Sequence, residues 1–297
     1  TREADMSRGL GDVYKRQAGN RARMKDRLES YGQGDVPVVF AHANGFPPGS
    51  YRQFFEHLAD RCVITAYRHR PLWDKATPPP NLNWSLFADD LIDYLRHRGG
   101  EPVWMMGHSL GGAVSIMAAS RHPEFFRGLV LIDPVMFRTR RTLGAKLLPK
   151  SRRRRNPMVR GALGRPHHFE SHQAAFDFYR SKRAFAGMGD SALWDYVQAS
   201  KVPGEEGGLR LAYPGVWEAG VYASPPWMWP HIVRLKMPTL GLVARESDVI
   251  TPGVFRRWQR LQADADLQLC PGGHLLPLER PLETATRVLD FLERQGA

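Results

Sequence analysis

The stretch "PVWMMGHSLGGAVSIMAASRH", residues 102–122, constrains the fold of this chain more than any other. An apolar run ends at Gly107, and an amphipathic helical pattern begins directly after Ser109. Gly-x-Ser-x-Gly at such a junction predicts a tight turn from a buried strand into a helix, which projects the serine hydroxyl above the sheet. Small residues are needed two positions before and after the serine, because larger side chains would collide in the turn. Ser109 is therefore the candidate nucleophile.

Short apolar, β-rich runs alternate with helical patterns on both sides of this turn. Strands are expected at 37–42, 62–67, 102–108, 127–133, 239–244 and 265–270, and helices at 51–60, 85–98, 110–122, 252–262 and 279–295. Strands and helices that alternate at this spacing predict a doubly wound, mostly parallel α/β sheet with helices on both faces.

The alternation breaks between residues 134 and 230. This third of the chain carries 16 Lys and Arg against 7 Asp and Glu, with helix-like segments at 172–185 and 190–200 and no clear strand. We therefore expect a core of residues 18–133 and 231–297, with residues 134–230 inserted as a helical basic cap. The run Arg152 to Arg155 could make a weak contact with an anionic surface, although such runs are more often solvated loops. No aromatic interleaving marks a nucleic-acid surface, so no nucleic-acid partner is expected.

The first 17 residues, "TREADMSRGLGDVYKRQ", differ from the rest because they have no apolar period. Residues 12–17 can be back-translated as GATGTGTATAAGAGACAG, which resembles the transposon-end adapter of sequencing libraries. Residues 1–17 are therefore expected to be a non-native tail, to be excluded from fold reasoning. The strands that would precede Val36 would then survive only in part, within residues 20–31.

Composition narrows the class of protein further. The 297 residues are 42% hydrophobic, yet no window of 18 is continuously apolar and no signal-peptide pattern opens the chain. We expect no transmembrane segment and a cytoplasmic location. The two cysteines, Cys62 and Cys270, are far apart and belong to no Cys/His cluster, so neither a disulfide nor a zinc site is expected. No metal or other cofactor is expected for the chemistry either.

A serine nucleophile needs a base, and the base needs an acid that holds it in one tautomer. His274 stands after the last expected strand in "GGHLLPLERP", and Asp248 follows the preceding strand in "ESDVITP". Ser109, Asp248 and His274 are the predicted catalytic triad. Glu246 is the reserve acid, and Asp133 at the end of "LVLID" is a further alternative.

These pieces together resemble the α/β-hydrolase superfamily over nearly all of residues 36–295. The matching motifs are "HANG", "GHSLGG", "SDVITP" and "GGHLLPLERP". The resemblance implies a hydrolase with Ser109 as nucleophile, Asp248 as acid, His274 as base, and a cap over the active site. Two features depart from the family: residues 68–71 replace a common Asp-x-Arg-Gly-x-Gly turn, and His-Gly has become His-Ala before Asn44.

The oxyanion that forms during acyl transfer requires fixed N–H donors. Leu110 follows the nucleophile at a helix N-terminus and is expected to supply one backbone N–H. The second should come from the loop after the strand 37–42, where the resemblance implies the backbone N–H of Asn44 in preference to that of Phe46. His42 is then expected to be structural, because His274 already fills the role of base.

Phe46, His108, Trp227 and Trp229 are candidate substrate-pocket residues, although the two tryptophans could equally hold a cap hinge. The leading hypothesis is a serine hydrolase that cleaves a small, partly apolar carboxylic ester, thioester or lactone through an acyl-enzyme. The same triad could instead hydrolyse carbon–carbon or amide bonds, or form peracids. A hypothesis from a different class is a ligand receptor or interaction protein on a hydrolase scaffold.

Overall fold

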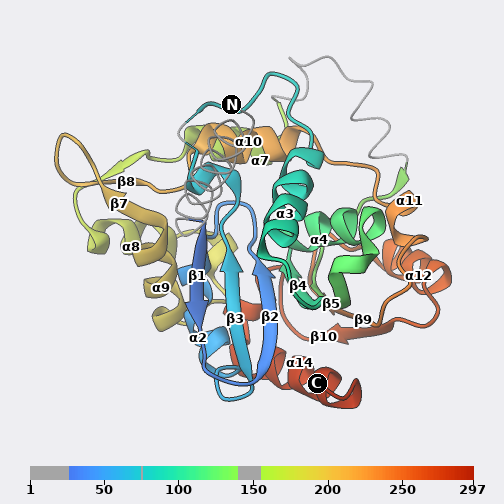
Figure 1. The fold of residues 1–297 in the computed structure, drawn as a ribbon. Coiled ribbons are helices and arrows are strands. Elements are labelled where there is room, and N and C mark those ends of the chain that lie inside the picture. Colours follow the sequence, from blue (N-terminus) through green and yellow to red (C-terminus); the bar gives the residue numbers. More distant parts are fainter. Residues whose placement is uncertain (1–26, 75, 140–154) are drawn as a thin grey trace, which may run out of the picture.

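A computed structural model describes residues 27–74, 76–139 and 155–297. Its centre is a seven-stranded sheet in the order β1-β3-β2-β4-β5-β9-β10 (Figure 1). The strands are β1 (Leu28–Tyr31), β2 (Val36–Ala41), β3 (Cys62–Tyr67), β4 (Val103–His108), β5 (Phe126–Ile132), β9 (Thr239–Ala244) and β10 (Asp266–Cys270). Every neighbouring pair is parallel except β1 with β3. The predicted mostly parallel α/β sheet is confirmed.

Successive residues of the central strands point to opposite faces of the sheet, and both faces are apolar. Helices therefore cover both faces. Val39, Met105 and Leu131 face one layer, to which α3 (Ser85–Arg98), α4 (Leu110–Arg121), α11 (Trp229–Ile232) and α12 (Pro252–Leu261) contribute. Phe40, Met106 and Ile132 face the other, with α2 (Arg52–Glu56), α13 (Leu276–Glu279) and α14 (Pro281–Arg294). Strands buried on both faces read as continuous apolar runs, which explains why their positions were predictable.

The chain between β5 and β9 forms the inserted segment, whose α7 (Pro157–Gly164) and α10 (Gly215–Ala223) lie above the carboxyl ends of the strands (Figure 1). It also contains α8 (His172–Arg180) and α9 (Asp190–Ser200). The expectation of no strand here is wrong: β6 (His168–Phe169), β8 (Leu209–Leu211) and β7 (Lys201–Pro203) form a small antiparallel sheet. These strands have two or three residues each, too short for an alternating pattern to stand out.

The sheet edge near the start of the chain is β1, which pairs antiparallel with β3 from Leu28 opposite Tyr67 to Tyr31 opposite Ile64. A strand therefore occupies part of the 20–31 stretch in which remnants were expected. Residues 1–17, on which the adapter hypothesis depends, lie outside the described residues, as do Arg152 to Arg154.

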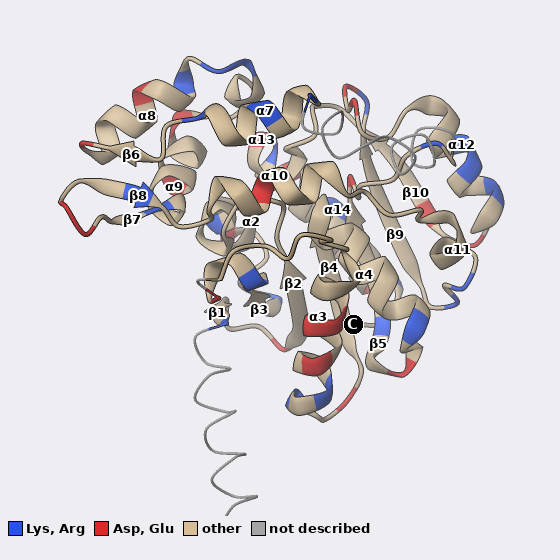
Figure 2. Ribbon diagram, turned by 90° about the horizontal axis from the view of Figure 1, so that it is seen from above, with Lys and Arg blue, Asp and Glu red and all other residues tan. Residues whose placement is uncertain are grey.

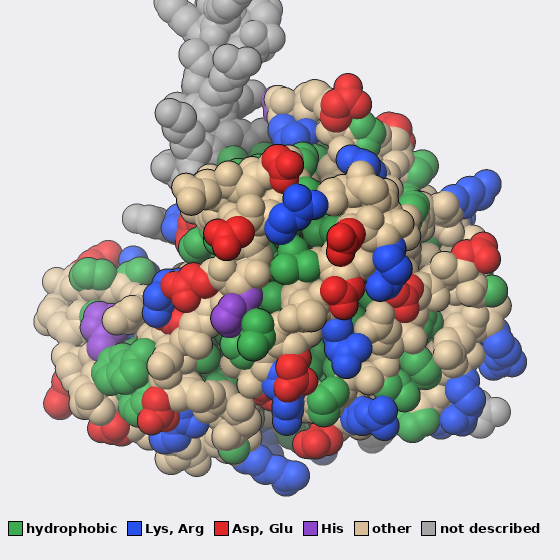
Figure 3. Space-filling view, turned by 90° about the horizontal axis from the view of Figure 1, so that it is seen from below, with side chains coloured by type: hydrophobic (Ala, Val, Ile, Leu, Met, Phe, Trp, Pro, Cys, Tyr) green, Lys and Arg blue, Asp and Glu red, His purple; other side chains and the backbone are tan. Residues whose placement is uncertain are grey.

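Charged side chains are distributed over the surface with both signs interspersed. Figure 2 shows basic and acidic residues on most of the outer helices, with several basic residues along α12. The face seen from below mixes Lys and Arg with Asp and Glu among small hydrophobic patches (Figure 3). Within the described ranges, no helix combines the length and apolar content needed to cross a lipid bilayer.

Candidate active site

The turn between β4 and α4 holds Ser109 at φ 55° and ψ −114°, in the left-handed region that side chains rarely occupy. Its glycines are required by space. A Cβ at Gly107 would lie 2.6 Å from the Gly111 backbone, and a Cβ at Gly111 would lie 2.0 Å from the carbonyl oxygen of Ala41. The strained turn is kept in place by the Ser109 N–H, which donates to the Ile132 carbonyl at 3.0 Å. The sequence prediction of a serine raised at a tight strand-to-helix turn fits this geometry.

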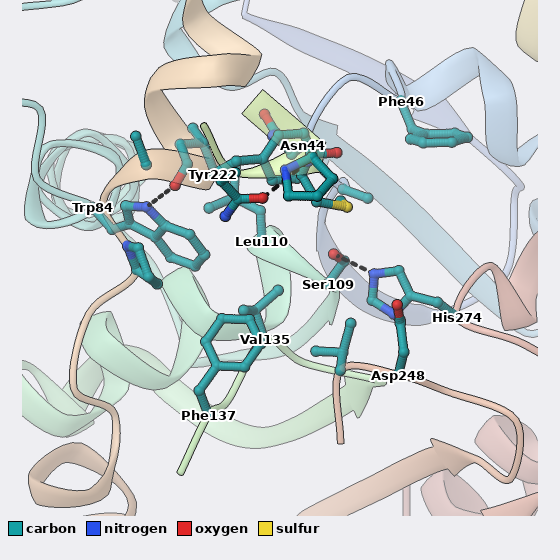
Figure 4. Close-up of a pocket in the computed structure, with 18 of the residues that line it drawn as sticks. Asn44, Phe46, Trp84, Ser109, Leu110, Val135, Phe137, Tyr222, Asp248 and His274 are labelled. Carbon is teal, nitrogen blue, oxygen red and sulfur yellow. Dashed lines mark hydrogen bonds between the residues drawn. The ribbon is translucent and has the colours of Figure 1, made fainter. Parts of the chain in front are cut away.

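His274 lies after β10 and reaches back to the serine. Its Nε2 is 2.8 Å from Ser109 Oγ (Figure 4). The loop turns at Gly272, whose φ is 117°, and Glu279 Oε2 accepts a hydrogen bond from the Gly273 N–H at 2.6 Å. The His274 side chain is 26% exposed, so the ring borders the pocket while the loop behind it is anchored.

The carboxylate against His274 is Asp133, which corrects the prediction of Asp248. Asp133 Oδ2 lies 2.6 Å from His274 Nδ1, and its side chain is fully buried. Asp248 is exposed and lines the pocket, and Glu246 is exposed as well. The ends of β5 and β9 are neighbours in the sheet, so either strand could have carried the acid. Asp133, considered as an alternative from the sequence, occupies the position.

The surroundings of Asp133 suit a buried negative charge. Oδ1 accepts from the Ala244 N–H at 3.2 Å, and Oδ2 accepts from the Ser247 hydroxyl at 2.5 Å in addition to His274. The backbone of Asp133 has φ 38°, held by its N–H donating to the Leu242 carbonyl at 2.7 Å. A left-handed backbone at a non-glycine residue costs energy and is commonest at functional sites. The signal available in the sequence was an Asp before Pro134 at a strand end.

The candidate oxyanion donors come from two different segments of the chain, and both line the pocket together with Ser109. Leu110 is the first residue of α4, where amides have no partner within the helix and the helix dipole favours negative charge. Asn44 follows β2 and is buried, and both residues line the pocket with Ser109 (Figure 4). The Asn44 side-chain amide donates to the Glu218 carbonyl on α10 at 3.2 Å. Its side chain is thus used to hold the inserted segment, which leaves the backbone N–H as the candidate donor.

A cavity of about 520 Å³ surrounds the serine hydroxyl. Its wall is mainly apolar, and Trp84, Val135 and Phe137 lie to one side of Ser109 while Phe46 lies on the other (Figure 4). Both the sheet ends and the inserted segment contribute, the latter through Met158 and Tyr222 among others. The prediction that Phe46 lines the pocket agrees with this arrangement.

Three other predicted pocket residues lie elsewhere. His108 is fully buried behind the turn, where its Nε2–H donates to the His274 carbonyl at 2.8 Å. Trp229 donates through Nε1 to the Phe137 carbonyl at 3.1 Å, and Trp227 donates to Thr139 Oγ1 at 3.2 Å. The tryptophans therefore hold the chain that follows β5, which is the hinge-like alternative. Aromatic composition alone could not distinguish the two roles.

Burial keeps the histidine behind the turn neutral. It lowers the pKa of His108 to about 3, with the nearby His274 adding to the effect. His108 Nδ1 accepts from the Tyr51 hydroxyl at 2.8 Å, consistent with a proton on Nε2. Within the described residues, no group of three or more His, Cys, Asp or Glu side chains is gathered as a metal site.

Comparisons with known proteins place this arrangement in a family. The model of the Alpha/beta hydrolase family matches residues 38–287. The solved structure of E-2-(acetamidomethylene)succinate hydrolase superposes with a TM-score of 0.76 at 21% identity, covering 90% of this chain and 94% of that one. An esterase from Thermogutta terrifontis gives 0.65 at 20% identity, over 90% and 92%. The chain belongs to the alpha/beta hydrolase family, which confirms the resemblance.

Curated relatives include lipases. Lipase LipV of Mycobacterium tuberculosis is 26% identical over 220 residues, 68% of this chain and 74% of that protein. Monoglyceride lipase of Rattus norvegicus is 45% identical over 76 residues, 22% of this chain. The chain spans only about a quarter of the length of that rat lipase. Both of these curated relatives are lipases.

Proposed function

We propose that this chain is a serine hydrolase that cleaves a carboxylic ester, thioester or lactone with a partly apolar acyl group. The observation that carries the proposal is the chain of contacts from Ser109 Oγ to His274 Nε2 at 2.8 Å and from His274 Nδ1 to Asp133 Oδ2 at 2.6 Å. A serine, an imidazole and a buried carboxylate in this order are the parts that acyl transfer needs. The lipase relatives agree with an ester substrate.

In the first half of the reaction, Ser109 Oγ attacks the substrate carbonyl carbon as His274 Nε2 takes the hydroxyl proton. The carbonyl oxygen becomes an oxyanion and accepts from the N–H groups of Leu110 and Asn44. Removing one such donor costs about 3 to 4 kcal/mol of transition-state stabilisation in related chemistry. His274 then gives its proton to the leaving alcohol or thiol as the carbon–heteroatom bond breaks, and the acyl group remains on Ser109.

In the second half, a water molecule attacks the acyl carbon while His274 Nε2 takes its proton. The bond to Ser109 Oγ breaks, the serine regains its proton from His274, and a carboxylic acid leaves. Asp133 stays ionised throughout and stabilises the imidazolium that forms twice per cycle. No group besides the substrate and water is consumed.

The lining of the pocket is the argument for an apolar acyl group in the substrate. A cavity of about 520 Å³ is within the range of small-ligand sites, and its lining is mostly hydrophobic. The charged lining residues Arg155 and Asp248 are both exposed. We further propose that residues 134–230 act as a cap, because α7 and α10 contribute part of the wall over Ser109.

The test is a panel of p-nitrophenyl esters of increasing acyl length, assayed with the parent and with Ser109→Ala. We expect hydrolysis by the parent and a loss of roughly 10⁴-fold or more in Ser109→Ala. Equal rates in the two proteins would overturn the proposal. Labelling of Ser109 by a fluorophosphonate separates a hydrolase from a receptor on the same fold, and faster cleavage of amides or vinylogous diketones than of esters would move the assignment to those substrates.

A further inference from the structure

The peptide between Ala43 and Asn44 carries the second candidate oxyanion donor. Because a trans peptide points its carbonyl and its N–H in opposite directions, the orientation of one decides that of the other. The Ala43 carbonyl oxygen lies 2.8 Å from His42 Nδ1, and it also accepts from the Phe46 N–H at 3.2 Å. With its carbonyl held there, the peptide directs the Asn44 N–H away from the His42 ring.

The His42 ring is held in the one tautomer that can donate to Ala43. The backbone N–H of His69 points at His42 Nε2, 3.0 Å away, so this nitrogen must be the acceptor. The proton is therefore on Nδ1, facing the Ala43 carbonyl. Burial lowers the pKa of the fully buried His42 well below its ordinary value, with His69 contributing, so the ring stays neutral.

The side chain of His69 completes the arrangement. Its Nε2–H donates to the His42 carbonyl at 3.0 Å, and the two rings lie 4.4 Å apart between centroids. Burial lowers the pKa of His69 to about 4. His69 belongs to the "RHRP" turn after β3, where this chain departs from its family. The histidine that follows β2 and the one that follows β3 thus form a fully buried pair beneath the peptide.

The other polar group of Ala43 is held as well. Its N–H donates to the Tyr51 hydroxyl at 3.0 Å, and that hydroxyl contacts His108, which in turn holds the His274 carbonyl. The loop after β2 and the loop of the catalytic base are therefore joined by one buried set of hydrogen bonds. Neutral partners suit this region, since an unpaired charge here would be costly.

We propose that His42, held by His69, is a positioning residue that keeps the Asn44 N–H turned toward the oxyanion. The proposal rests on the proposed function. If the Ala43–Asn44 peptide flipped, the Ala43 carbonyl oxygen would face the developing negative charge in place of an N–H donor. The contacts on His42 Nδ1 and Nε2 oppose that flip, so the pair acts on the transition state more than on substrate binding.

Substitutions at His42 separate positioning from simple packing. Asn places an amide N–H near the position of Nδ1, Gln places its amide near Nε2, and Leu has neither. We expect kcat to fall about 10²- to 10³-fold in His42→Leu with KM nearly unchanged, and to stay within about tenfold of the parent in His42→Asn. Affinity for a trifluoromethyl ketone, which forms an oxyanion on Ser109, should fall in parallel with kcat. His69→Leu should lose activity, and His69→Gln, which keeps a donor near Nε2, should recover most of it.

The matched control is His231→Asn, because His231 on α11 contacts the hydroxyl of Ser120 on α4 through Nδ1 at 2.7 Å, and neither residue lines the cavity. It should leave kcat unchanged. If His42→Leu does not fold, the comparison of His42→Asn with His42→Gln decides, and an equal or greater activity of the Gln variant overturns the proposal. Full kcat in folded His42→Leu overturns it too. If Ser109→Ala retains activity, the proposed function itself has failed.

Discussion

Two buried carboxylates, one at a strand end and one in the inserted segment, are stabilised in different ways. Asp133 accepts from a backbone N–H, a hydroxyl and an imidazole that the sheet and its loops hold in place. Glu218 on α10 is paired with the Arg165 guanidinium at the end of α7, and burial raises its pKa despite that partner. Fixed dipoles can hold a charge without a second charge, whereas an ion pair depends on both side chains being present.

The two carboxylates fit different roles of the two regions. In the proposed reaction, Asp133 at the strand end must keep its charge while His274 gains and loses a proton. The inserted segment forms part of the pocket wall, and its ion pair lies close to the loop after β2 that carries Asn44: a Cβ at Gly45 would lie 3.0 Å from Glu218 Oε2. The following substitutions test this comparison, from the largest expected effect to the smallest.

Asp133→Asn should have the largest effect, a fall in kcat on the order of 10⁴-fold, because an amide holds His274 in the wrong tautomer. The protein should stay folded, since the Ala244 N–H can still donate to the side-chain oxygen. Steady-state kinetics on a p-nitrophenyl ester provide the measurement. Asp248→Asn is the matched control and should remain within a few-fold of the parent. An equal loss in Asp248→Asn would return the acid role to that residue.

Arg165→Met should destabilise the protein by about 3 to 5 kcal/mol, because it leaves the Glu218 carboxylate buried without its partner. The two side chains are only 14% and 10% exposed. Urea unfolding followed by tryptophan fluorescence measures the change.

The double variant Arg165→Met, Glu218→Leu should regain most of that stability, because both charges are then gone. The surface pair Arg96 and Asp93, with both side chains more than half exposed, is the control. Arg96→Met should change the free energy of unfolding by less than about 1 kcal/mol. Equal losses from Arg165→Met and Arg96→Met would contradict the comparison.

Lys201→Met should remove a pH dependence of stability. Burial lowers the pKa of Lys201 to about 7, with Arg165 adding to the effect, while its pKa in the unfolded chain is about 10.4. Between those values the unfolded state binds more protons, so stability from this group rises as pH increases. From pH 7 to 9 the rise should be on the order of 2 kcal/mol.

Neighbours offset part of the cost of burying the Lys201 charge. The ammonium group donates to Ser200 Oγ at 2.8 Å and lies 4.5 Å from the Tyr179 ring centre. Urea unfolding of both proteins at pH 6, 7 and 9 gives the difference, in which the other titrating groups cancel. Lys201→Met should be the more stable protein at pH 6. A difference that stays constant from pH 6 to 9 would show that Lys201 does not titrate in this range.

Trp227→Phe should have the smallest effect. The tryptophan is 39% exposed and donates one hydrogen bond to Thr139, so its loss should cost about 1 kcal/mol or less. The preference among acyl chain lengths should not change. A shifted preference would show that Trp227 acts on the substrate after all.

Much of the fold could be read from local pattern. The expected helices 85–98 and 190–200 and the expected strand 239–244 coincide with α3, α9 and β9. These segments have strong periodicity or continuous apolar runs, and local signals suffice for them. The small sheet of the inserted segment was missed, because such short strands are defined by their partners rather than by their own residues.

The residues of the candidate site also differ in whether local sequence could identify them. Ser109 and His274 could be placed from the sequence because glycines beside a strand end mark a tight turn that larger residues could not form, and such a turn exposes the side chain next to them. The sequence could not show which residues line the pocket. His108 and Trp229 are buried away from the pocket because of how distant elements pack. An alternation of strands and helices does not say which way a side chain turns after the strand ends.

The sequence by itself determined most strands of the central sheet, the serine turn and the histidine loop, because the signal for each lies in residues next to one another in the chain. Only the tertiary structure decided which acid meets His274. Asp133 and Asp248 follow neighbouring parallel strands, and the left-handed backbone of Asp133, together with donors from Ala244 and Ser247, turns its carboxylate onto the ring. Such a choice depends on contacts between segments more than a hundred residues apart, and no local pattern records it.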